Sequence, residues 1–298
     1  RQVLALDPGN FNARYLLGVI RHEQGRHAEA LDLIAATLRI NPNLPNVLSN
    51  YGLVLAALGR CEEALVHYDR ALAIKPDLPE TFNNRGNTLQ QLKRFDEALA
   101  SYDRALALRP DFYGALNNRG NTLQQMERLD EALADYTKAL AIRPDFTVAW
   151  NNLGNTLRKL KRYEDALVNY DKAIAINPGF VMAWNNRGIA LSDLGRYPEA
   201  LTSFDRALAI QPDYADAWNN RGNALQCLLR FDEALAAYDR ALAVKPDYAE
   251  AWSNRGRTLW QMKRQDEALA SYSRAIEIKP DYAEALSNRG NMLWAEYR

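Results

Sequence analysis

The chain has 298 residues, of which 48% are hydrophobic, with 37 Lys and Arg against 37 Asp and Glu. This apolar content argues against disorder, and a net charge of zero without blocks of like charge argues against nucleic acid or an acidic membrane as a partner. No apolar run approaches the roughly 18 residues of a membrane span.

The positions of the cysteines and histidines indicate neither a metal site nor a catalytic site. Cys61 and Cys227 lie far apart in sequence, and His22, His27 and His67 do not recur at a ligand spacing. Because the sequence also lacks a nucleophile elbow and a phosphate loop, we expect no cofactor and no catalytic residue in this segment, although the parent protein could carry a catalytic domain. The chain does not begin with Met, so any targeting signal would lie outside it, and a cytoplasmic location is the expectation.

Three ladders of identical residues recur every 34 residues along the chain, and chance does not place three ladders in register. A fixed period of this length is typical of an architecture in which each repeat is one supersecondary unit. The prolines are Pro8, Pro42, Pro76, Pro110, Pro144, Pro178, Pro212, Pro246 and Pro280; the glycines are Gly18, Gly52, Gly86, Gly120, Gly154, Gly188, Gly222, Gly256 and Gly290; and the alanines are Ala30, Ala64, Ala98, Ala132, Ala166, Ala200, Ala234 and Ala268.

Taken in chain order, the period predicts a single solenoid domain over residues 1–298. Residues 1–10 contain the end of a second helix and its linker, residues 11–282 contain eight full repeats, and residues 283–298 contain the first helix of a ninth. An array cut in this way leaves apolar side chains uncovered on its last helix. We therefore expect a fragment of a longer protein, with end-to-end self-association through the uncapped terminal helices. The uncovered residues are Leu286, Met292 and Leu293.

The fifth repeat, residues 147–180, shows why each repeat is predicted to be a pair of helices. Apolar residues recur there at steps of three and four in two successive stretches, as in amphipathic helices. The break between the stretches carries Lys161, where other repeats carry Gly25, Gly59 or Gly195. Each repeat is thus expected to be a helical hairpin of about 34 residues. The apolar residues are Trp150, Leu153, Leu157 and Leu160 in the first stretch and Ala166, Leu167, Tyr170, Ala173 and Ile174 in the second.

Each ladder has a mechanical reason. Glycine inside a helix costs about 1 kcal/mol relative to alanine, so the glycine ladder predicts close approach of a neighbouring helix. The alanine ladder supplies a small face on the second helix, and the proline ends that helix. After the proline, Asp247 and Asp281 each precede a Glu by three residues, which predicts capping boxes for the next first helix.

These residues resemble the tetratricopeptide repeat pattern of Trp, Leu, Gly, Tyr, Ala, Phe or Tyr, Ala and Pro, with Leu157 where the family often has Tyr. The resemblance covers essentially the whole chain. It implies an all-α fold, an α-solenoid in which helix-turn-helix hairpins form a right-handed superhelix and the first helices line a concave groove that binds partners. In the fifth repeat the matching residues are Trp150, Leu153, Gly154, Leu157, Ala166, Tyr170, Ala173 and Pro178.

The residue immediately before the ladder glycine is usually apolar in the family but is Arg in six repeats here. An Arg on a packed face needs a partner, and an Asp lies sixteen residues before five of the six. We interpret each couple as an ion pair between consecutive repeats that fixes their stacking register; the alternative is a solvated charge worth about 0.2–1 kcal/mol. The five couples are Asp69 and Arg85, Asp103 and Arg119, Asp171 and Arg187, Asp205 and Arg221, and Asp239 and Arg255.

Three columns of asparagine accompany the glycine ladder, although asparagine is a mediocre helix former. The first column stands two residues before the glycine, the second three residues before it, and the third one residue after it. The first column is Asn50, Asn84, Asn118, Asn152, Asn186, Asn220, Asn254 and Asn288; the second is Asn83, Asn117, Asn151, Asn185 and Asn219; and the third includes Asn87, Asn121, Asn155 and Asn223.

The asparagine columns are the candidate binding site. An amide offers donors and an acceptor, which match the N–H and C=O of an extended peptide whatever its side chains; alternatively, the amides satisfy each other or neighbouring helices. The ladder resembles that of the arm of bacterial O-linked N-acetylglucosamine transferases, where it holds substrate polypeptide. The first and third columns are therefore predicted to bind a protein or peptide in extended conformation, either in a protein–protein interaction scaffold or in the substrate-recruiting arm of a larger glycosyltransferase.

Overall fold

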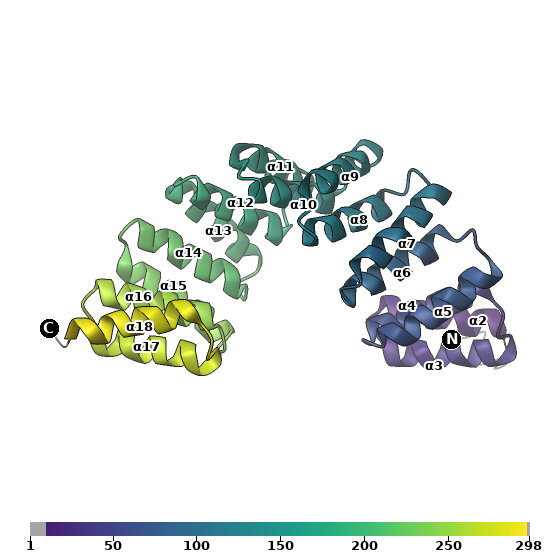
Figure 1. The fold of residues 1–298 in the computed structure, drawn as a ribbon, viewed down its shortest axis with the longest axis horizontal. Coiled ribbons are helices and arrows are strands. Elements are labelled where there is room, and N and C mark those ends of the chain that lie inside the picture. The colour runs from purple at the N-terminus through teal and green to yellow at the C-terminus, as the bar shows by residue number, and fades with distance from the viewer. Residues whose placement is uncertain (1–9, 297–298) are drawn as a thin grey trace. The chain divides into compact units, whose positions relative to one another are not determined.

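The computed structural model describes residues 10–296, and within this range the chain is helical without a strand. Seventeen helices, α2 to α18, alternate between the first and second helices of successive hairpins (Figure 1). The first helices are α2 (Phe11–Glu23), α4 (Pro45–Ala57), α6 (Pro79–Gln91), α8 (Tyr113–Gln125), α10 (Thr147–Lys159), α12 (Val181–Asp193), α14 (Ala215–Cys227), α16 (Ala249–Gln261) and α18 (Ala283–Glu296). The second helices are α3 (His27–Ile40), α5 (Cys61–Ile74), α7 (Phe95–Leu108), α9 (Leu129–Ile142), α11 (Tyr163–Ile176), α13 (Tyr197–Ile210), α15 (Phe231–Val244) and α17 (Gln265–Ile278).

The helices form two compact units, Arg1–Pro144 and Asp145–Arg298. Inside each unit, a helix packs against its hairpin partner and then against the first helix of the next hairpin, so the hairpins stack as a repeat solenoid. The predicted all-α solenoid is confirmed. A single domain over residues 1–298 and a right-handed superhelix stay predictions, and most of the predicted tail of a preceding repeat lies in residues 1–9, outside the described residues.

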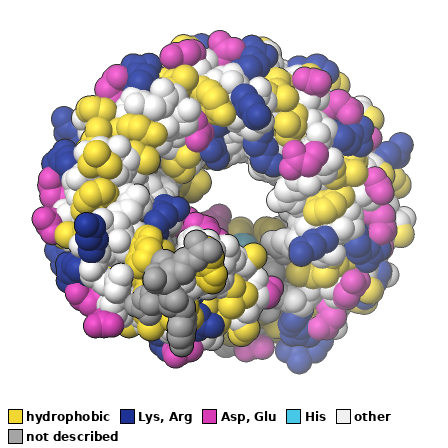
Figure 2. Space-filling model, turned by 60° about the vertical axis from the view of Figure 1, so that its left-hand side comes forward, with side chains coloured by type: hydrophobic (Ala, Val, Ile, Leu, Met, Phe, Trp, Pro, Cys, Tyr) yellow, Lys and Arg dark blue, Asp and Glu magenta, His cyan; other side chains and the backbone are white. Residues whose placement is uncertain are grey.

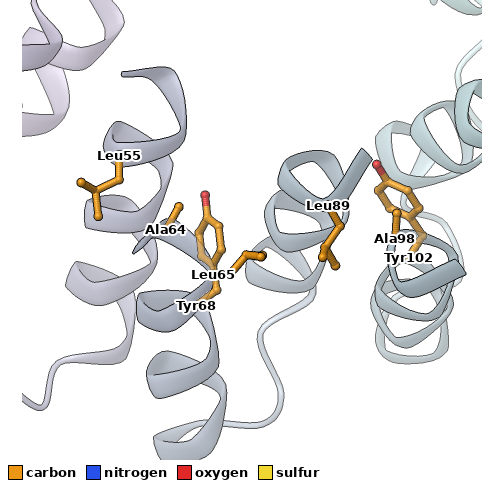
Figure 3. Close-up of a cluster of buried hydrophobic side chains, with 7 residues drawn as sticks. All are labelled: Leu55, Ala64, Leu65, Tyr68, Leu89, Ala98 and Tyr102. Atoms are coloured by element: carbon orange, nitrogen blue, oxygen red, sulfur yellow. The ribbon is translucent and has the colours of Figure 1, made fainter. Parts of the chain in front are cut away.

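The glycine ladder lies where the two helices of a hairpin approach each other, as predicted. A Cβ atom added to Gly222 would lie 2.5 Å from Cε1 of Tyr238. This contact is a steric clash, and the tyrosine ring would have to move to remove it. Ala234, on the facing turn of the second helix, is fully buried. Figure 3 shows two successive hairpins of this kind, in which Tyr68 and Tyr102 pack among alanine and leucine side chains. A larger side chain at the glycine position would separate the helices and open this core.

The turn inside each hairpin requires a left-handed backbone at one residue. Glycine supplies it at Gly25, Gly59 and Gly195, with φ of 74°, 77° and 74°. Non-glycine residues take the same conformation in the other described hairpins, at a steric cost that glycine avoids. These residues are Lys93, Glu127, Lys161, Leu229 and Lys263.

The capping box predicted at Asp247 is wrong. Helix α16 begins at Ala249, its N-cap is Tyr248, and no side chain caps it. Asp247 lies one residue too early, and its backbone carbonyl accepts the N–H of Ala249 at 3.1 Å. Tyr248 is half-buried and packs against the buried cluster of Ala241, Leu242 and Ala251, at the position that a capping side chain would occupy. Asp281 stands at the same distance before the first residue of α18.

Candidate functional site

The three asparagine columns belong to first helices, which meet along one side of each unit. Successive first helices contact each other there, α4 with α2 and α6 in one unit and α12 with α10 and α14 in the other. Among the described second helices, α3 to α17, no two contact each other within either unit. We call the surface along which the first helices meet the first-helix face.

Hydrogen bonds between neighbouring first helices tie the first asparagine column to the second. Asn186 donates from Nδ2 to Oδ1 of Asn151, 35 residues earlier. The second column is buried, with Asn151 1% and Asn219 0% exposed, so each bond supplies a partner that a buried amide needs. Most of the first column is half-buried, and one such bond uses only part of an amide's capacity. The four pairs are Asn118 to Asn83 at 3.0 Å, Asn186 to Asn151 at 2.9 Å, Asn220 to Asn185 at 3.1 Å and Asn254 to Asn219 at 3.0 Å.

The third column has a role that the sequence analysis did not assign. Each of its four predicted members accepts a hydrogen bond from the tyrosine hydroxyl of its own hairpin, fifteen residues later. These tyrosines are fully buried, and burial raises the pKa of Tyr170 well above its ordinary value. The asparagine therefore satisfies a hydroxyl group that lies away from water. The pairs are Tyr102 with Asn87 at 2.8 Å, Tyr136 with Asn121 at 2.7 Å, Tyr170 with Asn155 at 2.8 Å and Tyr238 with Asn223 at 2.8 Å.

The first-helix face is hollowed beside Asn50 and Asn84. A cavity of about 410 Å³ lies there among residues of α2, α4 and α6. Ser49 stands where the next five repeats carry a buried asparagine, and its smaller side chain accepts a hydrogen bond from Thr81 at 2.8 Å. Asn50 in turn donates to the hydroxyl of Tyr15. The cavity is lined by Tyr15, Asn46, Ser49, Asn50, Lys75, Leu78, Glu80, Thr81 and Asn84.

All five predicted Asp–Arg pairs are present. Nε of Arg187 lies 2.7 Å from Oδ1 of Asp171, and the Arg side chain is 22% exposed while the Asp side chain is 56% exposed. The pair joins a second helix to the first helix of the next hairpin, as the spacing predicted. Arg119 has a further partner that the spacing did not reveal, since its Nη2 lies 2.6 Å from the buried carboxylate of Asp135. The other pairs are Arg85 with Asp69, Arg119 with Asp103, Arg221 with Asp205 and Arg255 with Asp239.

Charges of both signs cover the surface. Figure 2 shows Lys and Arg side chains interspersed with Asp and Glu on the visible face, without a large field of one sign. No helix in the described part of the chain combines the length and the apolar character that a membrane crossing requires. Within residues 10–296, no group of three or more His, Cys, Asp or Glu side chains is placed to hold a metal ion.

Comparison with known proteins identifies the family. Tetratricopeptide repeat models match residues 113–146 and 147–180, residues 9–77, 43–111 and 180–245, and residues 219–283. The chain therefore belongs to the tetratricopeptide repeat family, whose members are protein-interaction scaffolds. No curated protein matches the chain.

Solved structures share this architecture. YrrB, described as a tetratricopeptide repeat protein with an unusual peptide-binding site, is 28% identical with a TM-score of 0.49, over 62% of this chain and 95% of that chain. A chain of the APC/C hetero-tetramer Cut9–Hcn1 is 18% identical with a TM-score of 0.69, over 90% of this chain and 52% of that chain. A tetratricopeptide repeat protein from Parabacteroides merdae is 19% identical with a TM-score of 0.67, over 84% and 98% of the two chains. The last two likenesses show the fold.

Proposed function

We propose that the first-helix face binds a partner polypeptide in extended conformation through hydrogen bonds between the first asparagine column and the peptide backbone. The observation that carries the proposal is the cavity beside Asn50 and Asn84, because donors and acceptors surround a space on that face. A peptide backbone presents one N–H and one C=O at nearly every residue, and an amide can bind both.

The spacing of the column suits an extended chain. Packed helices lie about 8–10 Å apart and an extended chain advances about 3.3–3.6 Å per residue, so neighbouring members would meet roughly every third peptide residue. A neutral hydrogen bond contributes about 0.5–1.5 kcal/mol. Affinity would therefore come from several weak contacts along Asn50, Asn84 and Asn118 in one unit, and along the remaining members in the other.

The third column has a supporting part in this proposal. Asn87, Asn121, Asn155 and Asn223 hold buried tyrosine hydroxyls, which fixes the helices that carry the first column. Their contact with a peptide stays a prediction, as does that of Asn152, Asn186, Asn220, Asn254 and Asn288.

The proposal can be tested with the triple variant Asn50→Ala, Asn84→Ala and Asn118→Ala. A fluorescein-labelled library of unstructured peptides is titrated by anisotropy, beside the same library with N-methylated backbones. We expect the triple variant to bind the unmethylated peptides at least tenfold more weakly than the parent chain does. The N-methylated peptides should likewise bind the parent chain at least tenfold more weakly than the unmethylated peptides do.

The control is Asn43→Ala, because Asn43 is exposed in the turn between α3 and α4. This variant should bind as the parent chain does. Unchanged binding by the triple variant, or equal binding of N-methylated peptides, would contradict the proposal. A melting temperature lowered by more than a few degrees with unaltered affinity would assign the column to helix packing alone.

End-to-end self-association is proposed from the last helix. Leu286, Leu293 and Trp294 of α18 are 39%, 37% and 60% exposed, and a Cβ added to Gly290 would meet no atom within 4 Å, unlike the other ladder glycines. The prediction that Met292 is uncovered is wrong, because its side chain packs in a buried cluster with Leu259 and Tyr272 and is 1% exposed. A second copy of the chain would cover this apolar surface. Sedimentation velocity should show association that Leu286→Ser with Leu293→Ser weakens; concentration-independent sedimentation of the parent chain would refute it.

The alternative role, a substrate-recruiting arm of a larger glycosyltransferase, is supported by the asparagine resemblance alone. Sequencing the gene beyond the present chain would decide it. Absence of catalysis, absence of a cofactor and a cytoplasmic location stay predictions.

A further inference from the structure

Arg221 differs from the other paired arginines in the partners of its guanidinium group. Arg85, for example, donates from Nη1 to Oγ of Ser101 on the second helix of its own hairpin, at 2.7 Å, in addition to its Asp. The equivalent residue for Arg221 is Ala237, which has no polar side-chain group. Within residues 10–296, Arg221 forms a side-chain hydrogen bond with Asp205 alone, at 2.7 Å. The second partners elsewhere are Asp135 for Arg119, Ser203 for Arg187 and Ser271 for Arg255.

Ala237 borders a cavity of about 470 Å³ among residues of α13, α14 and α15. Much of its wall is apolar, formed by Leu208, Trp218 and alanine side chains. The guanidinium carbon atoms of Arg221 and Arg240 lie 5.8 Å and 5.9 Å from the centre of the Trp218 ring. The cavity therefore combines an apolar wall with two cations beside it.

The cations outnumber the anions in this wall. Asp205 is the one carboxylate against Arg221 and Arg240. Nearby, Arg230 and Glu233 neutralise each other through two hydrogen bonds of 2.7 Å and 2.6 Å. Arg240 is exposed and forms no ion pair with any residue in the described range. The charge balance favours one additional carboxylate, which a guanidinium group binds well.

We propose that this cavity binds a segment of a partner protein in which a carboxylate side chain stands beside a bulky aliphatic side chain. The carboxylate takes the place that serine occupies in other hairpins and accepts from Nη of Arg221 and from Arg240. The aliphatic side chain packs against Leu208 and Trp218. The cavity is lined by α13, α14 and α15 and by no member of the first asparagine column, so this site is independent of the proposed function.

The probe is a fluorescein-labelled peptide with the sequence acetyl-Gly-Leu-Glu-Leu-Gly-amide, titrated against the full chain by anisotropy. We expect saturable binding, and binding at least fivefold weaker when Gln replaces Glu in the peptide. The protein variant Arg240→Gln should lose at least fivefold in affinity. The matched control is Arg206→Gln, because Arg206 occupies the equivalent exposed place in the preceding hairpin, where Ser203 satisfies Arg187; its affinity should not change.

Two substitutions test whether the site exists because Ala237 replaces the serine that binds the arginine in other hairpins. Ala237→Ser supplies the missing partner and should abolish binding, whereas Ser203→Ala should create a second site beside Trp184 and raise the stoichiometry from one to two peptides per chain. Thermal unfolding of both variants checks that they fold. Equal binding of the Gln peptide, full binding by Ala237→Ser, or equal losses in Arg206→Gln and Arg240→Gln would overturn the proposal. Loss of binding in the triple asparagine variant would also overturn it, because it would place the peptide on the first-helix face.

Discussion

Tyr170 donates its hydroxyl hydrogen to Oδ1 of Asn155 at 2.8 Å, across the interior of one hairpin. The next hairpin carries the same two positions as Phe204 and Ile189, and the first carries them as Ile34 and Val19. The Asn–Tyr pair is thus replaced by an apolar pair in these two hairpins, whereas Tyr68 and Tyr272 stand fifteen residues after Leu53 and Arg257 instead of an asparagine. Each of the four predicted members of the third column has a tyrosine hydroxyl as its hydrogen-bond partner.

The first prediction uses this natural exchange. Asn155→Ile should lower the free energy of unfolding by about 1–3 kcal/mol, because it leaves the buried Tyr170 hydroxyl without its acceptor. The double variant Asn155→Ile with Tyr170→Phe should recover most of the loss, since it reproduces the Ile189–Phe204 pair. Urea unfolding of the three chains measures both changes. No recovery in the double variant would mean that the tyrosine bond does not explain the asparagine.

The repeat, the hairpins and the ion pairs could be predicted from the sequence because each leaves a periodic trace. The Asp171–Arg187 pair appeared as a spacing of sixteen residues, and the pair exists at that spacing. The partner of Asn155 could in principle have been read in the same way, from the fifteen-residue covariation with Tyr170. The sequence alone does not single out this covariation, because peptide binding also explains the asparagine and packing in the core also explains the tyrosine.

Other features of the site leave no periodic trace. The cavity beside Asn50 is lined by side chains from three helices, and its size depends on how those side chains pack. Helix α16 begins after Tyr248, which packs against the core, and not after Asp247, although aspartate is the better capping residue. Packing at this level is a property of the folded chain, and the local sequence alone does not determine it.

The second prediction concerns the left-handed turn residue Leu229, which has φ of 60° and is 70% exposed. A left-handed conformation costs an L-residue roughly 1–2 kcal/mol, and glycine costs about 0.5–1 kcal/mol in unfolded-state entropy. Leu229→Gly should therefore stabilise the chain by about 0.5 kcal/mol, measured by thermal unfolding. The reverse control, Gly195→Ala, should destabilise it. Destabilisation by Leu229→Gly would show that the leucine makes a contact that outweighs its strain.

The third prediction concerns pH. Burial lowers the pKa of His67 below its ordinary value of 6.5, Arg70 lowers it further, and Glu63 opposes the shift. The unfolded chain therefore takes up a proton at a higher pH than the folded chain. Stability is fully present above pH 6.5 and falls as the pH decreases from there towards the lowered pKa.

His67→Ser tests this pH dependence with a residue that the chain already uses, because Ser101 occupies the equivalent place in the next hairpin. The decrease in melting temperature between pH 7.5 and pH 5 should be smaller in this variant than in the parent chain. Part of the decrease should persist, since burial also lowers the pKa of His22. An identical decrease in both chains would exclude His67 as its source.

The last prediction separates the buried ion pair from the exposed ones. Arg119 binds Asp135 through Nε at 2.7 Å and Nη2 at 2.6 Å, and the Asp135 side chain is only 4% exposed. Arg119→Ala leaves that carboxylate buried without a cation and should cost about 3–5 kcal/mol. Arg85→Ala is the matched control: its partner Asp69 is 57% exposed and can return to water, so the loss should stay below about 1 kcal/mol.

A rescue completes this test. Asp135→Ser in the Arg119→Ala background removes the stranded charge and installs the residue that the equivalent place carries at Ser101, Ser203 and Ser271. The double variant should be more stable than Arg119→Ala alone, even though it contains one substitution more. Urea unfolding at pH 7 measures all four chains. Equal losses in Arg119→Ala and Arg85→Ala, or no rescue by serine, would show that water reaches Asp135 and that its burial does not determine the cost.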